Sequence, residues 1–349
     1  FAYMSILDVI LLLLIVYVLY LSSFDKLKTF AILGLFVGII IQTMYVIYCK
    51  RKFEECSYRF IIDKSLLKNM TGFAGWVFLG NGAWILNTQG LNILINLFFG
   101  VTLNASRGIA DQVNGFVTRF VDNFTIAMNP QITKSFAEGD FEYMHNLVCW
   151  GAKLSYYLML IFVIPICLEA EQILHLWLGV VPEYTVTFVR LTLASTMCTV
   201  IGNSLVTSMQ ASGKVKRYQT WVSVWGFLCF PLTYIAFKVG WSPIWAYIIY
   251  LIIYFFLIFI RIYLVKELIH MKWQRYVYDV CFICFIVTIV ALIMPFLIYY
   301  IQPSSILRLI EVSVTSIVSS ICTIYMLGLK KNERRKIIKV IKKNFYKII

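Results

Sequence analysis

The sequence predicts an all-α integral membrane protein with ten transmembrane helices. The 349 residues are 61% hydrophobic and only 14% charged, and their mean hydropathy is +0.82. Globular chains average about 25% charged residues. Apolar runs of roughly 20 residues recur along the chain and match a bilayer core of about 30 Å. None of these runs alternates in period two, so a helical bundle is favoured over a β-barrel.

The predicted spans follow one another closely along the chain. They cover residues 1–22, 28–49, 72–99, 104–129, 148–172, 184–210, 218–238, 243–264, 277–300 and 304–328. The chain opens within the first apolar run, without a start Met or the charged n-region of a signal peptide. We therefore expect a chain that lacks its natural beginning.

Lysine and arginine alternate between the two sides of this predicted arrangement. The loops after the second, fourth, sixth and eighth spans, together with the C-terminal tail, hold 23 of the 31 Lys and Arg residues. Arg261 is counted here with the loop after the eighth span. By the positive-inside rule the basic side is cytoplasmic, so both chain ends are expected in the cytoplasm. A formal net charge of +14 could indicate a nucleic-acid partner, but the alternation of basic residues between loops indicates membrane topology instead, so no nucleic-acid partner is predicted.

One predicted span carries amides and charges where a lipid-facing helix would be apolar. Its polar residues are spaced by three or four positions, which places them on one face of a helix. They are Asn104, Arg107, Asp111, Asn114, Thr118 and Asp122. In lipid, each unsatisfied polar group costs on the order of several kcal/mol. The stripe is therefore predicted to face a water-filled or polar cavity between helices, and the functional site is expected there.

The charged residues of this stripe have more than one interpretation. Arg107 and Asp111 are four positions apart and can pair on a helix surface. Arg107 then either binds an anionic substrate, with Asp111 as its partner or as an ion-coupling carboxylate, or the pair only fixes helix packing. Arg119 and Asp122 offer a similar pairing or coupling role nearer the cytoplasmic end. Arg190, in the sixth span, either extends to the outer interface or makes a second phosphate contact.

The span before the stripe is rich in amides. It contains Asn87, Gln89, Asn92 and Asn96, and the stripe itself adds Asn114. Such amides either hydrogen-bond across helices and stabilise packing, or bind hydroxyl-rich ligands such as sugars. Their number favours a surface that faces a ligand.

The sequence offers little for catalysis or metal binding. Its three histidines are far apart, and it has no HExxH, Walker, GxSxG or Rossmann pattern. No catalytic residue, metal site or cofactor is predicted, while H⁺ or Na⁺ stays open as a coupling ion. Lys153 lies near a predicted span end, and the spacing of Arg308 and Glu311 predicts a local pair at the membrane interface.

Several segments resemble those of bacterial polysaccharide flippases. They read QGLNI at 89–93, NLFFG at 96–100, NASRGIADQV at 104–113, AMNPQITKS at 127–135 and QASGKVKRYQ at 210–219. On these residues the chain resembles Wzx-type flippases, which transport lipid-linked oligosaccharides. This family belongs to the multidrug/oligosaccharidyl-lipid/polysaccharide exporter superfamily.

The resemblance implies a MATE/MurJ-like two-lobe fold whose first four helices are missing here. Residues 1–50 would then form the last two helices of the first lobe, and 51–71 a basic cytoplasmic inter-lobe loop. Residues 72–265 would form the second six-helix lobe, and 276–328 two additional helices. Residues 329–349 would form a basic cytoplasmic tail.

The same resemblance implies a function. The chain would flip an undecaprenyl-diphosphate-linked oligosaccharide from the inner to the outer leaflet of the bacterial cytoplasmic (inner) membrane. The product would serve capsule, O-antigen or exopolysaccharide synthesis, and a polysaccharide polymerase and a chain-length regulator would be partners. Arg107 and Arg190 would bind the diphosphate. The glycan-binding amides would be Asn87, Gln89, Asn92, Asn96 and Asn114.

Two alternatives to this function remain. One is a multidrug or cation exporter of the same superfamily, which favours acidic and aromatic cavity walls. The other, from a different class, is a membrane oligosaccharide polymerase, which favours a large outward loop with catalytic residues. The buried arginines disfavour the first alternative, and the short outward loops disfavour the second.

Overall fold

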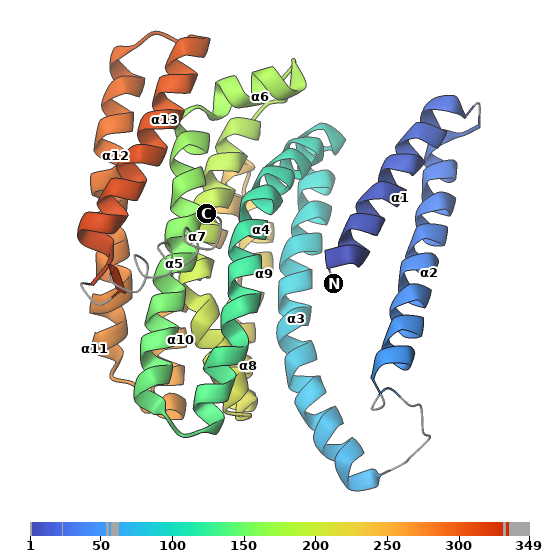
Figure 1. Cartoon of the computed structure of the whole chain (residues 1–349). Coiled ribbons are helices and arrows are strands. Elements are labelled where there is room, and N and C mark those ends of the chain that lie inside the picture. The colour runs from blue at the N-terminus through green and yellow to red at the C-terminus, as the bar shows by residue number, and fades with distance from the viewer. Residues whose placement is uncertain (1, 23, 54–55, 57–62, 331–332, 335–349) are drawn as a thin grey trace, which may run out of the picture. The chain divides into compact units, whose positions relative to one another are not determined.

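The computed structural model is predominantly helical over the residues that it describes (Figure 1). These residues are 2–22, 24–53, 56, 63–330 and 333–334. No strand occurs among them, which confirms the all-α prediction for this part of the chain. The chain divides into two compact units, residues 1–67 and residues 68–349.

The first unit contains two helices that pack against each other, α1 (Ala2–Leu21) and α2 (Lys26–Lys52). Asp25 starts α2: its carboxylate accepts hydrogen bonds from the backbone N–H groups of Leu27 at 3.0 Å and Lys28 at 3.4 Å. This cap satisfies N–H groups that have no partner within the helix. The helix boundary is therefore fixed by one acidic residue between two apolar runs.

The second unit is built from helices that range from 4 to 37 residues in length. They are α3 (Lys64–Phe99), which begins just before the unit boundary, α4 (Val101–Ala137), α5 (Phe141–Leu168), α6 (Ala170–Leu178), α7 (Thr185–Ala211), α8 (Val215–Phe227), α9 (Cys229–Lys238), α10 (Ile244–Ile269), α11 (Trp273–Tyr276), α12 (Ile283–Ile301) and α13 (Ile306–Thr323). Two π-helical segments complete the unit. Val277–Phe282 joins α11 to α12, and Ile324–Gly328 continues α13.

Seven helical segments among the described residues are long and apolar enough to cross a membrane. They are Lys26–Lys52, Phe141–Leu168, Thr185–Ala211, Val215–Lys238, Ile244–Ile269, Trp273–Ile301 and Ile306–Gly328. The chain thus has the composition and helix lengths of a multi-pass membrane protein. The prediction of ten spans also includes α1, α3 and α4. Of these, α4 is 37 residues long but too polar to belong to the apolar set.

At the centre of the second unit, α7 packs against α4, α5 and α10. Close approach of α5 and α7 depends on a small residue, as is common where membrane helices meet. A methyl group on Gly151 of α5 would come within 3.1 Å of the Ser204 hydroxyl on α7. Around this centre, α8 and α9 cover α10, while α12 and α13 pack on each other and on α5 (Figure 1).

A buried ion pair ties α13 to the junction of α5 and α6. Arg308 donates from Nε and Nη2 to the two carboxylate oxygens of Glu169, both at 2.9 Å. Its Nη1 donates to the backbone carbonyl of Gln302 at 3.2 Å. The guanidinium therefore has a partner for each nitrogen. The expected local pair with Glu311 does not form, because Glu311 accepts instead from the Gln302 side chain at 2.6 Å.

A second buried ion pair joins α5 to the segment that follows α13. Lys153 Nζ lies 2.8 Å from both carboxylate oxygens of Glu333, and the lysine side chain is only 1% exposed. The sequence suggested that this lysine lies near a span end. The structure places it in the middle of α5 instead. The predicted basic tail, 329–349, otherwise lies largely outside the described residues.

We expect the substitution Glu169→Gln to lower the free energy of unfolding by about 3–5 kcal/mol, because Arg308 would stay buried without a compensating charge. The matched control is Glu267→Gln, which breaks the exposed pair of Glu267 with Arg217 and is expected to cost about 1 kcal/mol or less. Denaturant titration of the protein in detergent micelles measures both. Equal losses for the two variants would contradict the structural role assigned to the buried pair.

Candidate functional site

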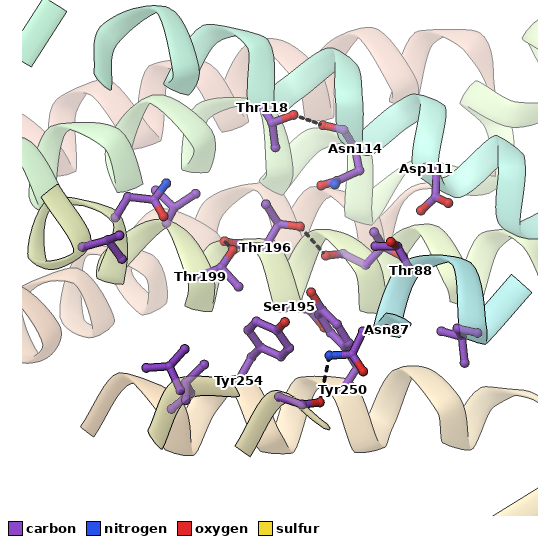
Figure 2. Close-up of a pocket in the computed structure, with 18 of the residues that line it drawn as sticks. Asn87, Thr88, Asp111, Asn114, Thr118, Ser195, Thr196, Thr199, Tyr250 and Tyr254 are labelled. Atoms are coloured by element: carbon purple, nitrogen blue, oxygen red, sulfur yellow. Dashed lines mark hydrogen bonds between the residues drawn. The ribbon is translucent and has the colours of Figure 1, made fainter. Parts of the chain in front are cut away.

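A cavity of about 710 Å³ opens between five helices of the second unit. Its walls are formed by α3, α4, α7, α8 and α10. Figure 2 shows amide, hydroxyl, phenol and carboxylate groups from α3, α4, α7 and α10 directed towards a common space. A wall of this composition is unusual inside a bundle of apolar helices, because polar groups in a membrane face either each other or water.

Helix α4 contributes five of the six residues of the polar stripe that its spacing predicts, whereas Asn104 does not line the cavity. Its cavity-lining residues are Arg107, Asp111, Asn114, Gly115, Thr118, Val121 and Asp122. The Thr118 hydroxyl donates back to the Asn114 carbonyl at 3.0 Å, within the helix (Figure 2). This bond uses the backbone carbonyl of Asn114 and not its side chain. The side-chain Oδ1 has no hydrogen-bond partner among the described residues. The stripe therefore presents polar groups to the cavity and not only to its own helix.

Arg107 is the most deeply buried charge of the cavity wall, with 5% of the residue exposed. Its Nη2 donates to the backbone carbonyl of Thr88 on α3 at 3.0 Å. Its Nε lies 3.5 Å from Asp111 Oδ2, an ion pair that is too poorly aligned to be a hydrogen bond. Nε and Nη1 are without a hydrogen-bond partner among the described residues. The guanidinium is thus held in place from one side and keeps donor capacity for another group.

Helix α3 contributes Asn81, Asn87, Thr88 and Gln89 to the cavity wall. Asn87 is 4% exposed, and its Nδ2 donates to the Gly226 carbonyl where α8 ends, at 2.8 Å (Figure 2). This bond fixes the amide so that its Oδ1 stays without a partner in the described chain. One half of the amide therefore joins two helices, while the other half can accept a bond from water or a ligand.

Helix α7 supplies a row of hydroxyl groups that the sequence analysis overlooked. Thr192, Ser195, Thr196 and Thr199 line the cavity, followed one turn later by Asn203. Their spacing by three and four positions is the same signal that identified the α4 stripe. Several of these hydroxyls donate to carbonyls of their own helix, for example Thr196 to Thr192 at 3.0 Å (Figure 2). Their oxygens can still accept hydrogen bonds from the cavity side.

Helices α8 and α10 complete the wall with aromatic and cationic groups, which were also overlooked. Tyr247, Tyr250, Tyr254 and Arg261 lie on one face of α10, and Tyr218 lies near the start of α8. The sequence pattern grouped Arg261 with a cytoplasmic loop, and this assignment is wrong. The structure places it within α10, in the cavity wall. The spacing of the α10 residues by three, four and seven positions would have placed Arg261 on the tyrosine face.

Buried polar atoms without a partner are concentrated in this cavity. Thirteen such side-chain atoms occur in the described residues, and eight of them belong to residues that line the cavity. The eight are Asn87 Oδ1, Arg107 Nε and Nη1, Asn114 Oδ1, Thr192 Oγ1, Tyr218 OH, Tyr247 OH and Arg261 Nε. Buried polar groups in proteins nearly always have hydrogen-bond partners. These groups are therefore placed to bind water or a polar ligand.

Some of the predicted site residues lie elsewhere. Asn92 and Asn96 are not part of the cavity wall, and Asn92 instead donates to Gln89 Oε1 at 3.3 Å. Arg190 donates from Nε to the Cys167 carbonyl at 2.8 Å and from Nη2 to that of Leu168 at 3.4 Å. It thereby satisfies carbonyls at the C-terminal end of α5. Arg119 is exposed on α4 outside the cavity wall.

The charges of the cavity wall balance in number, with Arg107 and Arg261 opposite in sign to Asp111 and Asp122. Within the described residues, no group of three or more His, Cys, Asp or Glu side chains is arranged to hold a metal ion. The wall can therefore recognise a ligand through hydrogen bonds, aromatic faces and single charges. Its polar groups belong to helices of which several are long enough to span a membrane.

Comparison of the sequence with known proteins assigns no family to this cavity. No protein-family model matches the chain, and no curated protein matches it either. The role of the cavity must therefore be inferred from its own residues.

We expect water to reach the hydroxyl row of α7. The test variant is Thr199→Cys, in the cavity wall, and the control is Phe256→Cys, on the apolar outer face of α10. The cysteine at 199 should react at least about tenfold faster with a charged thiol reagent than the cysteine at 256, because thiolate formation requires water. Phe256 is 53% exposed and does not line the cavity. Peptide mass spectrometry separates the new sites from the nine native cysteines, none of which lines the cavity. Equal rates would show that the cavity is dry.

Proposed function

We propose that the chain is part of a transporter that moves a lipid-linked oligosaccharide across the bacterial cytoplasmic membrane. In this proposal an undecaprenyl-diphosphate-linked glycan passes from the inner to the outer leaflet by alternating access. The observation that carries the proposal is the buried Arg107 guanidinium in the wall of a polar cavity, with Nε and Nη1 lacking a hydrogen-bond partner in the described residues. A cation inside a membrane is costly and is retained where it has a function.

The cavity wall matches the chemistry of such a substrate. Arginine binds phosphate oxygens through charge-assisted hydrogen bonds. Arg107 has two nitrogens without a hydrogen-bond partner in the described residues, one of which, Nε, is in an ion pair with Asp111. Sugar hydroxyls both donate and accept, so they can pair with Asn87, Asn114 and Thr199. Tyr250 and Tyr254 add aromatic rings, against which the apolar faces of sugars can pack. The volume of about 710 Å³ is within the usual range for a small-molecule site.

The membrane topology of the proposal extends beyond the seven apolar helices. In the proposed arrangement α1, α3 and α4 also cross the membrane, which gives ten spans and places both chain ends in the cytoplasm. The alternation of basic residues between loops supports this orientation. The polar composition of α4 is compatible with a crossing helix, because its polar face lines the cavity and leaves its apolar face for packing.

The proposal includes the two-lobe arrangement implied by the sequence resemblance. Residues 72–265 would form the second lobe, which contains the cavity wall, and residues 1–50 would belong to the first. The Arg190 contact that the resemblance suggested is not part of this proposal, because Arg190 binds carbonyls of α5.

A second candidate function is export of cationic or aromatic compounds by a transporter of the same architecture. The observation that favours it is the wall of Tyr218, Tyr247, Tyr250 and Tyr254, since aromatic faces attract cations. Asp111 would then be the counter-ion. The burial of Arg107 disfavours this candidate, because a cationic drug would be repelled by it.

We expect Arg107→Ala in the complete transporter to lower surface polysaccharide by about tenfold or more, because a charge-assisted bond to phosphate contributes about 1.5–3 kcal/mol. Arg107→Lys should retain part of the activity, since the charge remains but the planar fork is lost. The control is Arg217→Ala, which removes an exposed arginine outside the cavity. Immunoblotting checks that all variants reach the same level in the membrane.

Two outcomes would count against the proposal. Undiminished polysaccharide in the Arg107→Ala strain would remove Arg107 from the mechanism. Normal polysaccharide combined with new sensitivity to cationic drugs would favour the second candidate function.

A further inference from the structure

A second arginine lines the cavity far from Arg107. Tyr247 lies close enough to Arg107 for the two polar groups to interact electrostatically. Tyr247 and Arg261 are both on α10 and 14 residues apart, which corresponds to about 21 Å along the helix. Arg107 and Arg261 therefore lie towards opposite ends of the cavity.

Arg261 has unused donor capacity. Its Nε is buried and has no hydrogen-bond partner in the described residues. The ion pairs found in that part of the chain do not include Arg261. Asp122 on α4 lines the same cavity but does not form an ion pair with it. A guanidinium can only donate hydrogen bonds, so its missing partner must be an acceptor.

Tyr218 provides a second donor next to this arginine. It lies one turn into α8, which packs against α10, and both Tyr218 and Arg261 line the cavity. The residue is 2% exposed, and its hydroxyl has no hydrogen-bond partner among the described residues. Two donors, one near the start of α8 and one in the second half of α10, thus line the cavity.

Gly202 on α7 makes room for the arginine. A methyl group at this position would come within 2.5 Å of Arg261 Nη1 and 3.1 Å of its Cδ. The absent side chain therefore lets the guanidinium pack directly against the α7 backbone. Because the clash is with the end of a flexible side chain, Gly202→Ala would displace the guanidinium and leave the helices in place. Gly202 is a positioning residue for Arg261.

We infer that Arg261 and Tyr218 form a second anion-binding site, for a phosphate or diphosphate group, at the end of the cavity remote from Arg107. Phosphate oxygens accept several hydrogen bonds at once, and arginine binds them with both charge and geometry. The loops that flank this end, before α8 and after α10, are on the basic side that the sequence assigns to the cytoplasm. Use of the site as the first contact for an entering substrate rests on the proposed function, whereas anion binding itself does not.

The test is calorimetric titration of the whole chain in lipid nanodiscs with inorganic pyrophosphate. We expect the wild-type chain to bind two equivalents, and Arg261→Gln and Arg107→Gln to bind one each. Tyr218→Phe and Gly202→Ala should weaken one of the two equivalents by about tenfold and leave the other unchanged. Gly75→Ala is the matched control, since a methyl group there meets no atom within 4 Å, and it should retain both equivalents.

A parallel titration with farnesyl diphosphate distinguishes a lipid-linked diphosphate from a free anion. If Arg261→Gln binds one equivalent fewer of each probe than the wild-type chain, the site accepts the lipid-linked group. If Arg261→Gln binds one equivalent fewer of pyrophosphate but the same number of equivalents of farnesyl diphosphate, the anion site is confirmed and its role in substrate entry is contradicted. Melting temperatures without ligand identify any variant that fails to fold, and Gly202→Ala then remains as an independent test.

The inference would be overturned if every variant bound two equivalents of pyrophosphate with unchanged affinities. Failure of the proposed function looks different. Arg107→Ala would leave surface polysaccharide intact, while Arg261→Gln still loses one equivalent of pyrophosphate in the titration.

Discussion

The interior of a bilayer offers no hydrogen bonds, and the arrangement of α3, α4, α7, α8 and α10 follows from this constraint. The polar face of α4 cannot meet lipid, so it faces the hydroxyl row of α7 and the tyrosine face of α10 across a shared space. The Asn87 bond to Gly226 and the Arg107 bond to Thr88 then fix α3 against α8 and α4. The polar groups that join these helices also form the cavity wall.

The basic side chains that are buried or partly buried in the described helices include two kinds. Arg308 and Lys153 are bonded to carboxylates at 2.8–2.9 Å and join α5 to neighbouring segments. Arg107 and Arg261 line the cavity and keep nitrogens without partners in the described residues. The first kind is satisfied within the protein and serves its architecture. The second kind retains the capacity to bind another group, which is the physical basis for the proposal that it binds a substrate.

Local spacing predicted what lies along one helix, and it failed where partners come from distant segments. The α4 face could be predicted because positions three and four apart share a side of a helix. The α7 hydroxyls were overlooked because serine and threonine can hydrogen-bond to the backbone of their own helix. Their presence in an apolar span therefore does not by itself indicate a polar cavity. Arg261 was overlooked because it lies near a span end, where arginine is common. The partner of Arg308 is 139 residues away at Glu169, a distance over which spacing carries no information.

The pairing of Lys153 with Glu333 has a consequence for biosynthesis. The two residues are separated by 180 positions, so ribosomes working at about 5–20 residues per second complete α5 on the order of ten seconds or more before the carboxylate exists. During that interval the lysine cannot be neutralised by its final partner in a hydrocarbon environment. We therefore expect the nascent α5 to stay beside water, in the insertion machinery or at the headgroup level, until α13 and Glu333 have been made.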